Sequence, residues 1–395
     1  MSKVRSLFLF ALVSCFFSTY LPAAEPTEWT LLLFMNGKND LQEYVDIGLK
    51  QLEQVAHPES INVIAQAGKL DWPTVKRLKI SKASTTVLQD LGASDMGDAK
   101  TLKDFIHWGV ENYPARHYLL ILWDHGYGWH ADEEDDTPVK PGTWDISTDD
   151  TTQHTITTLE FAAVVEDFSK LIGRKIDIVS SDACFMASLE VAYELTPYVD
   201  YYLGSEDLEP ESGWPYHHIL EQWAKNANPS PEVIGKIIAD EYVKYHELGT
   251  EVPYGAVSYS VMNLSKMNAF IEAFRTLSAA LLTLANPKPF LELGMKAENF
   301  AFEDYVDWGD LAKKYGTGPL TPGLASPLIQ ASAAYHSLVI YNRGTEEFKN
   351  ATGASIWFPK SRTDLEKLLP LYRELKFAAA TGWDRALELM LRRRR

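Results

Sequence analysis

Two apolar segments of the sequence each end in a residue that can take part in nucleophilic catalysis. Residues 119–126 (LLILWDHG) place His125 directly after an apolar run, and residues 176–184 (IDIVSSDAC) place Cys184 in an equivalent position. A thiol becomes a strong nucleophile as the thiolate, and a neighbouring imidazole favours that form or removes the proton during attack. The two segments therefore point to catalysis by a cysteine and a histidine.

The interval between His125 and Cys184 contains one clear helical pattern, which predicts a single strand–helix–strand crossover. Adjacent parallel strands lie about 4.8 Å apart and end at the same edge of the sheet, so both reactive residues are expected there. Ligands bind at this edge in open α/β sheets. Gly126 has no side chain that would keep a substrate carbonyl away, and the backbone N–H groups of Gly126 and Cys184 could together form an oxyanion hole.

Each of these signals also has an ordinary structural interpretation. A single buried cysteine is usually a packing residue, and a histidine at a strand end often has no role in chemistry. Their joint placement favours catalysis, and the sequence contains no G-x-S-x-G, P-loop, H-E-x-x-H or C-x-x-C pattern of another enzyme class. His217 and His218 would point apart on a helix, which argues against a zinc site.

The elements that must position this pair follow an alternating pattern. Over the first two thirds of the chain, short apolar runs alternate with amphipathic segments, which predicts an α/β fold with a mostly parallel sheet flanked by helices. The expected strands are 29–36, 61–67, 75–81, 117–124, 175–181, 200–206 and 254–262. The expected helices are 39–56, 98–113, 156–172, 187–197 and 230–247, with Asn39, Thr155 and Ser230 as N-caps.

After about residue 265 the sequence becomes mainly helical. Long helical patterns cover 265–286, 289–302, 326–341 and 362–375, and one strand-like run covers 354–358. We therefore expect a catalytic domain over 25–265 and a mainly helical C-terminal subdomain over 266–395.

The N-terminus has the layout of a secretory signal peptide over residues 1–24. Lys3 and Arg5 precede an apolar run, and small residues stand at Ala23 and Ala24. No later stretch is long and apolar enough to suggest a membrane span. This pattern predicts an exported bacterial protein that is secreted, periplasmic or at the cell surface.

The chain has two cysteines, and one of them lies in the predicted signal peptide. Cleavage near Ala24 removes Cys15 and leaves Cys184 without a partner for an intrachain disulfide, in a compartment where thiols tend to oxidise. The alternative is a lipoprotein signal (LVSC, residues 12–15), in which Cys15 would become a lipid anchor.

The net charge of −17 disfavours DNA or RNA as a partner, because nucleic-acid affinity depends on Lys and Arg that neutralise phosphates. An acidic surface would instead attract basic peptides. The charge balance thus fits a protein that acts on other polypeptides.

Residues 130–154 show no regular pattern, which is unusual for a loop of this length inside a compact domain. The acidic run 132–136 could bind Ca²⁺ through its carboxylates, but it lacks the spacing of a known calcium loop. A solvated loop is the simpler interpretation, and we expect no obligatory metal or cofactor.

Four segments carry a specific resemblance to a known family. Residues 124–129 (DHGYGW) and 181–186 (SDACFM) resemble the two signature blocks of the clostripain family of cysteine peptidases, which belongs to the same clan as caspases, gingipains and legumain. Residues 204–210 (GSEDLEP) and 213–216 (GWPY) are also similar to that family. The similarity covers about 28–265, and beyond it the best match is 304–308 (DYVDW).

This resemblance implies a caspase-like fold and an endopeptidase that cuts protein or peptide substrates after Arg or Lys. It also implies a dyad of Cys184 and His125 without an obligatory third member, which acts through a thioester acyl-enzyme. One departure stands out, because several family members cut themselves between the two signature blocks. The only basic residue of the long loop is Lys140, which precedes Pro141, so we expect this chain to act uncut.

Asp182 matches the aspartate at the base of the family's primary specificity pocket, where a carboxylate can accept a bidentate guanidinium. The alternative is that Asp182 only caps a helix that starts near Ala187. Glu206 and Asp207 are candidates for additional negative charge in the same pocket, and the strand near 200–206 is a candidate for pairing with the extended substrate.

The main rival interpretation is an exported binding or scaffold protein that keeps the caspase-like fold without activity. The presence of Cys184, His125 and Gly126 together favours the enzyme.

Overall fold

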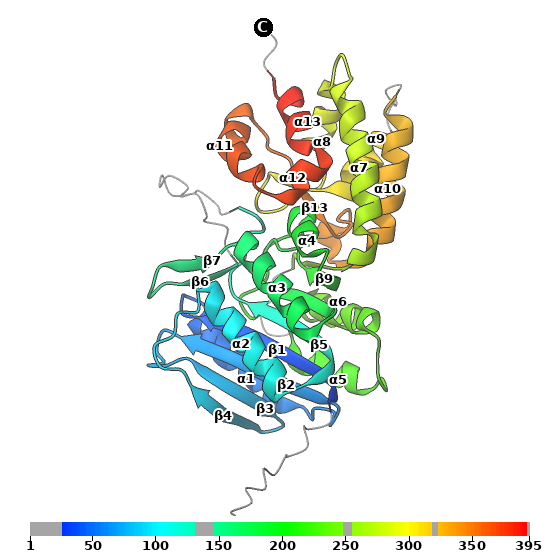
Figure 1. The fold of residues 1–395 in the computed structure, drawn as a ribbon. Helices are drawn as coiled ribbons and strands as arrows, with labels where there is room; N and C mark the ends of the chain where they lie inside the picture. The colour runs from blue at the N-terminus through cyan, green and yellow to red at the C-terminus, as the bar shows by residue number, and fades with distance from the viewer. Residues whose placement is uncertain (1–25, 131–145, 248–254, 318–322, 393–395) are drawn as a thin grey trace, which may run out of the picture.

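The computed structural model of the chain describes residues 26–130, 146–247, 255–317 and 323–392 (Figure 1). The predicted signal peptide, the acidic run 132–136 and Lys140 lie outside the described residues. Among the helices of the described part, none is long and apolar enough to cross a membrane.

The described residues build a nine-stranded sheet whose central strands are parallel. The five central strands run parallel, and an antiparallel pair extends the sheet at each side. In spatial order the strands are β12 (Val339–Gly344), β10 (Ser258–Asn263), β9 (Val199–Gly204), β8 (Ile176–Asp182), β5 (Ala115–Trp123), β1 (Thr27–Gly37), β2 (Ile61–Lys69), β3 (Lys76–Ser81) and β4 (Ser84–Asp90). The predicted α/β fold with a mostly parallel sheet is confirmed, and β4 is a strand that the sequence pattern did not reveal.

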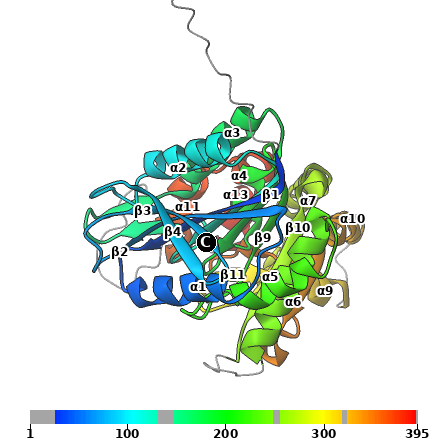
Figure 2. The same ribbon diagram turned by 90° about the horizontal axis from the view of Figure 1, so that it is seen from below.

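Both faces of the sheet are buried, as the near-continuous apolar runs of the parallel strands require. In β1, Leu32 and Phe34 join the core on one face, and Leu31, Leu33 and Met35 join the core on the other. Figure 2 shows the helices on the two sides of the sheet. The first face is covered by α2 (Ala99–Asn112), α3 (Thr158–Ile172) and α4 (Leu189–Leu195), and the second by α1 (Gln42–Gln54), α5 (Tyr216–Ala224) and α6 (Pro231–Glu247).

The helices begin at different residues from those expected in two of three cases. Helix α1 begins at Gln42 after Leu41, which has no side-chain cap, and the side-chain oxygen of Asn39 accepts the backbone N–H of Leu41 at 3.0 Å in the turn before the helix. Helix α3 is capped by Thr157, two residues after the expected Thr155, in a reciprocal capping box with Glu160. Ser230 precedes α6 and accepts a hydrogen bond from the backbone N–H of Val233 at 3.4 Å, as expected for an N-cap.

The C-terminal part is mainly helical, as predicted, and its helices gather at one end of the molecule (Figure 1). It also supplies strand β12 to the main sheet and a small sheet of two strands, so it is more than a helical appendage. The expected helix 326–341 ends at Leu338, and the chain continues directly into β12. The helices are α7 (Met267–Leu282), α8 (Lys288–Gly294), α9 (Trp308–Thr317), α10 (Ala325–Leu338), α11 (Arg362–Tyr372), α12 (Lys376–Thr381) and α13 (Trp383–Met390), and the small sheet is β11 (Tyr305–Asp307) with β13 (Ser355–Trp357).

The region 130–154 is not wholly without structure. Its described end contributes β6 (Ser147–Asp149), which pairs with β7 (His154–Ile156) in a short hairpin. The expectation of a structureless loop was therefore wrong for this end. Strands of three residues carry too little alternation to be recognised in a sequence.

A pair of buried acids joins the sheet to the C-terminal part. Glu206, just after β9, is fully buried and accepts a hydrogen bond from the backbone N–H of Gly353 at 3.0 Å. Asp307 is equally buried and accepts hydrogen bonds from the backbone N–H groups of Asp310 and Thr352, each at 2.6 Å. Burial, together with the charge of Asp307, raises the pKa of Glu206 well above its ordinary value.

This pair makes stability depend on pH in a defined direction. The unfolded Glu206 ionises near pH ~4.3, whereas the folded chain keeps its proton to higher pH, so the free energy of unfolding falls as pH rises above the unfolded pKa. We expect Glu206→Gln, which cannot ionise, to exceed wild type in unfolding free energy at pH 8 by on the order of 1 kcal/mol, with little difference at pH 4.

Urea denaturation of both proteins at the two pH values measures this difference. Glu206→Ala is the control, because it leaves the Gly353 N–H unpaired and should be less stable than wild type at pH 4. An equal decline of stability with pH in wild type and Glu206→Gln would contradict the prediction.

Candidate active site

The predicted crossover brings the two reactive residues to one edge of the sheet. Strand β5 pairs with β8 in parallel, with Trp123 opposite Asp182, and α3 is the helix between them. His125 and Cys184 each lie two residues along the chain beyond these partners, past the carboxyl edge. The distance between the two loops is thus set by the spacing of neighbouring strands.

A small pocket of about 50 Å³ lies at this edge. Both His125 and Cys184 line it, and so does Asp182, the predicted specificity residue. The other lining residues are Leu41, Trp123, Asp124, Ala183, Glu209, Pro210, Glu211 and Gly213. Three of the predicted site residues therefore share one cavity.

The Cys184 thiol is held against the backbone of Glu209. The N–H of Glu209 donates to Sγ at 3.1 Å, and the thiol lies 3.9 Å from the carbonyl oxygen of the same residue. Burial raises the pKa of Cys184 to about 12, and the hydrogen bond from Glu209 opposes this shift only in part. Burial thus favours the protonated thiol over the thiolate.

The residue after the nucleophile has an unusual backbone conformation. Phe185 has a φ of +58°, which residues with a side chain seldom adopt. Its N–H donates to the carbonyl oxygen of Asp207 at 3.1 Å, and its ring stacks on Phe302 with 4.2 Å between the centroids. These contacts hold the sharp turn that presents Cys184.

The histidine loop is organised by a buried carboxylate. Asp124 accepts hydrogen bonds from the side-chain amides of Asn36 at 2.8 Å and Asn39 at 2.5 Å. It also accepts the backbone N–H groups of His125 at 2.7 Å and Thr148 at 2.9 Å. This network fixes the backbone from which the imidazole projects.

The imidazole of His125 contacts a carboxylate on the other side. Its Nε2 lies 2.6 Å from Oδ1 of Asp40, whose side chain is 80% exposed. This pair was not anticipated from the sequence, because Asp40 lies in the loop after β1, far from His125 along the chain. The exposed carboxylate can orient the ring.

Gly126 is required by the close approach of the two catalytic loops. A Cβ atom at this position would lie 2.6 Å from the carbonyl oxygen of Cys184 and 3.0 Å from Cβ of Ala183. Any side chain at residue 126 would therefore push the histidine loop and the cysteine loop apart. The oxyanion hole formed by the N–H groups of Gly126 and Cys184 stays a prediction.

Asp182 lies buried at the pocket, with its carboxylate held by hydrogen bonds. It accepts the hydroxyl of Tyr216 at 2.7 Å and the backbone N–H of Trp214 at 3.2 Å. Burial raises the pKa of Asp182 to about 7. The alternative role as a helix cap was wrong, because α4 begins at Leu189 and Ser188 caps it.

The structure does not bring Glu206 and Asp207 to the pocket. The carboxyl group of Glu206 faces Gly353 in the C-terminal part, and that of Asp207 accepts the N–H of Ala301 at 2.8 Å. Both were candidates because they follow a strand directly, but the chain turns there and directs them away. The residue that does line the pocket is Glu209.

The expected pairing of substrate with the strand near 200–206 also needs correction. Strand β9 is hydrogen-bonded to β8 on one side and to β10 on the other, so it offers no free edge. The sequence pattern could not show this, because β10 pairs across a long separation along the chain.

The C-terminal part supports both catalytic loops through Tyr305. The hydroxyl of Tyr305 donates to the carbonyl oxygen of Tyr127 at 2.9 Å and accepts the N–H of Trp129 at 3.0 Å. Phe302 stacks on Tyr127 as well as on Phe185, with 6.0 Å between the Tyr127 and Phe302 centroids. Residues after 300 thus hold the loops that carry His125 and Cys184.

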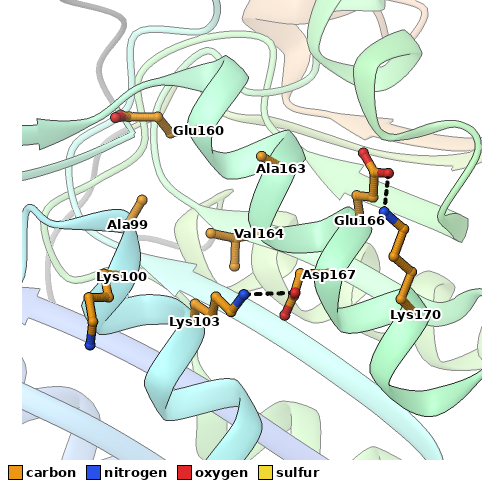
Figure 3. Close-up of a pocket in the computed structure, with 9 residues that line it drawn as sticks. All are labelled: Ala99, Lys100, Lys103, Glu160, Ala163, Val164, Glu166, Asp167 and Lys170. Carbon is orange, nitrogen blue, oxygen red and sulfur yellow. Dashed lines mark hydrogen bonds and ion pairs between the residues drawn. The ribbon is translucent and has the colours of Figure 1, made fainter.

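A larger groove of about 460 Å³ lies between α2 and α3 and contains neither reactive residue (Figure 3). Its charged side chains neutralise one another, with Lys103 paired to Asp167 at 2.8 Å and Lys170 to Glu166 at 2.5 Å. Within the described part of the chain, no group of three or more His, Cys, Asp or Glu could hold a metal ion. The reactive residues therefore mark the candidate active site.

A thiol and an imidazole at the carboxyl edge of a mostly parallel sheet define an α/β protein of the cysteine-peptidase class. Residues 33–389 match the sequence profile of the clostripain family, peptidase family C11, and the chain belongs to this family. The predicted resemblance is thereby confirmed over most of the chain.

Individual relatives agree with this assignment. A secreted C11 cysteine protease from Bacteroides thetaiotaomicron has a similar structure, with a TM-score of 0.73 and 18% identity over 90% of this chain and 99% of that one. A secreted C11 protease from the same organism with an irreversible peptide inhibitor gives a TM-score of 0.68 and 21% identity over 91% of this chain and 100% of that one. Clostripain from Hathewaya histolytica is 31% identical over 105 residues, which are 26% of this chain and 19% of that protein.

The packing of Gly126 gives a test of the site geometry. We expect Gly126→Ala to lower kcat/KM for peptide hydrolysis by about 10²-fold, because the new methyl group displaces the two loops by a fraction of an ångström or more. Steady-state kinetics measures the effect. Gly316→Ala is a suitable control, since a Cβ there meets nothing within 4 Å. Wild-type kcat/KM in Gly126→Ala would contradict the close approach described above.

Proposed function

We propose that this protein is an exported cysteine endopeptidase that cleaves peptide bonds after Arg or Lys. The observation that carries the proposal is the single pocket that His125, Cys184 and the buried acid Asp182 line together. Membership of the clostripain family supports the peptidase chemistry. The basic specificity is supported by the carboxyl group at the pocket and by the net charge of −17.

In the proposed reaction, Sγ of Cys184 attacks the substrate carbonyl carbon while the imidazole of His125 takes the thiol proton. The high pKa of the buried thiol favours proton removal during attack over a thiolate formed in advance. The N–H groups of Gly126 and Cys184 would stabilise the resulting oxyanion.

The tetrahedral intermediate then collapses to a thioester. The C–N bond breaks, and the imidazolium returns its proton to the leaving amine. Water, deprotonated by the same imidazole, attacks the thioester and releases the acid product with the free thiol. His125 thus serves as base and acid in turn, and Asp40 can orient it in both steps.

Export is part of the proposal. The N-terminal pattern of residues 1–24 supports it, and the relatives from Bacteroides thetaiotaomicron are described as secreted. Mass spectrometry of the mature N-terminus would distinguish a cleaved signal peptide from a lipid anchor at Cys15. A calcium requirement through the acidic run 132–136 stays an untested alternative.

The nucleophile can be tested directly. We expect the wild-type protein to hydrolyse fluorogenic peptides with Arg or Lys before the cut, and Cys184→Ala to lose this activity by at least about 10³-fold, because the acyl-enzyme can no longer form. Release of the fluorophore measures turnover, and circular dichroism verifies that the variant is folded. Undiminished turnover in Cys184→Ala would refute the assignment. A folded wild-type protein that cleaves nothing would instead favour the binding or scaffold alternative.

The specificity residue can be tested with an isosteric change. We expect Asp182→Asn to lower kcat/KM for Arg substrates by about 10- to 100-fold, because a charge-assisted hydrogen bond contributes about 1.5–3 kcal/mol. Its thermal stability should change little, since the amide oxygen can still accept from Tyr216 and Trp214. Kinetics with matched Arg and norleucine peptides and a thermal melt measure both quantities. An unchanged preference for Arg would place the specificity pocket elsewhere.

A further inference from the structure

A second buried carboxyl group, that of Glu209, lies at the specificity pocket next to Asp182. Glu209 lines the pocket and is only 8% exposed. Its carboxyl group is buried against that of Asp182, with which it shares a hydrogen bond, and the backbone N–H of Ala183 and the hydroxyl of Tyr242 also face it. Two acids in contact at a pocket repel each other once both are ionised, so their placement points to a cationic ligand that would satisfy both.

The groups packed against Glu209 are mainly acids and phenols, while His125, which lines the same pocket, is paired with Asp40. The ionisable groups that face it are Asp182 on β8, Cys184 after β8, Tyr202 on β9, Tyr216 on α5, Tyr242 on α6 and Tyr259 on β10. None of these side chains can carry a positive charge. Two ionised carboxylates in this enclosed site would repel each other, as in other acid pairs that share a proton.

Burial, reinforced by the charge of Asp182, raises the pKa of Glu209 well above its ordinary value. Asp182 is raised less, to about 7. The two groups titrate as a pair, and at neutral pH the pair keeps a proton that resides mainly on Glu209. Without a bound cation, the two acids therefore carry at most about one negative charge between them at neutral pH.

We propose that Glu209 is a second specificity-determining acid of this pocket, and that it releases its proton to solvent when the guanidinium or ammonium group of the substrate enters beside Asp182. The proposal rests on the proposed function and deepens it. Before binding, the two carboxyl groups share a proton. After binding, they share the positive charge of the substrate side chain. Only a cationic side chain can replace the proton in this way, and an uncharged side chain would leave the proton on the acids.

The position of Glu209 also connects the specificity pocket to the nucleophile. Its carboxyl group faces Asp182, while its backbone N–H donates to Sγ of Cys184 at 3.1 Å. One residue therefore contacts both the group that recognises the substrate and the atom that attacks it. Movement of Glu209 on cation binding would alter the hydrogen bond to the sulfur.

Enzyme kinetics with Glu209→Gln is the first test. Glutamine keeps the shape of the side chain but cannot supply a second negative charge. We expect kcat/KM for an Arg peptide substrate to fall about 10- to 100-fold, mainly through KM. In wild type, KM should rise as pH falls from 8 to 6, because the proton competes with the cation, and this rise should be smaller in Glu209→Gln.

Glu206→Gln is the matched control. Glu206 is another buried acid three residues earlier in the same segment, but its carboxyl group faces Gly353 and does not line the pocket. The kcat/KM of the Glu206→Gln variant should stay within about twofold of wild type, because no contact with the substrate is lost. Thermal melts of both variants show whether they are folded. If Glu209→Gln does not fold, Glu209→Asp keeps the acid, and an intermediate KM for the Arg peptide is expected.

Proton release is the second test, and it does not depend on turnover. Titration calorimetry of the Cys184→Ala protein with a tripeptide ending in arginine, in phosphate and in Tris at pH 7, gives the number of protons released. We expect about one proton for each peptide bound, and close to none in Cys184→Ala/Glu209→Gln.

The outcomes separate this proposal from the proposed function. Cleavage of Arg peptides by wild type, with unchanged kcat/KM in folded Glu209→Gln or with no proton release, overturns the role of Glu209 alone. Failure of wild type to cleave or bind any Arg or Lys peptide overturns the proposed function, and the role of Glu209 falls with it. Loss of affinity and of proton release in the glutamine variant supports the proposal.

Discussion

The parallel hydrogen bonding of β5 with β8 is the interaction on which the rest of the site depends. It places Trp123 opposite Asp182, and from these two residues the chain reaches His125 and Cys184 after equal lengths. The distance between the segments that carry His125 and Cys184 follows from the spacing of the two strands. The surrounding contacts adjust this arrangement: Asp124 fixes one loop, the Phe185 turn fixes the other, and Gly126 allows them to touch.

A second constraint is the pairing of acids with each other in the interior. Asp182 with Glu209 and Glu206 with Asp307 are pairs of buried carboxyl groups, one at the pocket and one at the junction with the C-terminal part. Buried charge of this kind is destabilising unless it is neutralised by a proton or a cation. The pair of Glu206 and Asp307 holds a proton to higher pH than a free carboxyl group does. In the proposal made above, the pocket pair exchanges its proton for a cation of the substrate.

The sequence predicted those features that follow from local periodicity. The apolar runs before His125 and Cys184 are long and regular, so the parallel sheet, its helices and the βαβ unit could be inferred, and the family profile over 33–389 agrees. Asp182 could be located because it belongs to the same strand as the nucleophile. Glu206 and Asp207 were misplaced because the direction of a side chain after a strand depends on the turn that follows.

Features that depend on contacts between residues far apart in the chain could not be predicted from the sequence. Glu209 reaches the pocket only because residues 205–213 fold back over Asp182, where Gly213 approaches the carboxylate so closely that a Cβ would lie 2.9 Å from Oδ1. Asp40 meets His125 across the edge of the sheet from the loop after β1. The strand β12 follows a helix without any turn signal, and its pairing with β10 decides its conformation.

The contact of Tyr305 and Phe302 with the catalytic loops has a consequence for how such a protein can change during evolution. An α/β unit that ended near residue 265 would keep its sheet but lose the side chains against which Tyr127 and Phe185 rest. The catalytic half therefore cannot be exchanged between proteins as an independent module. Gene fusion or recombination should preserve the two halves together, and new modules should be accepted only outside them.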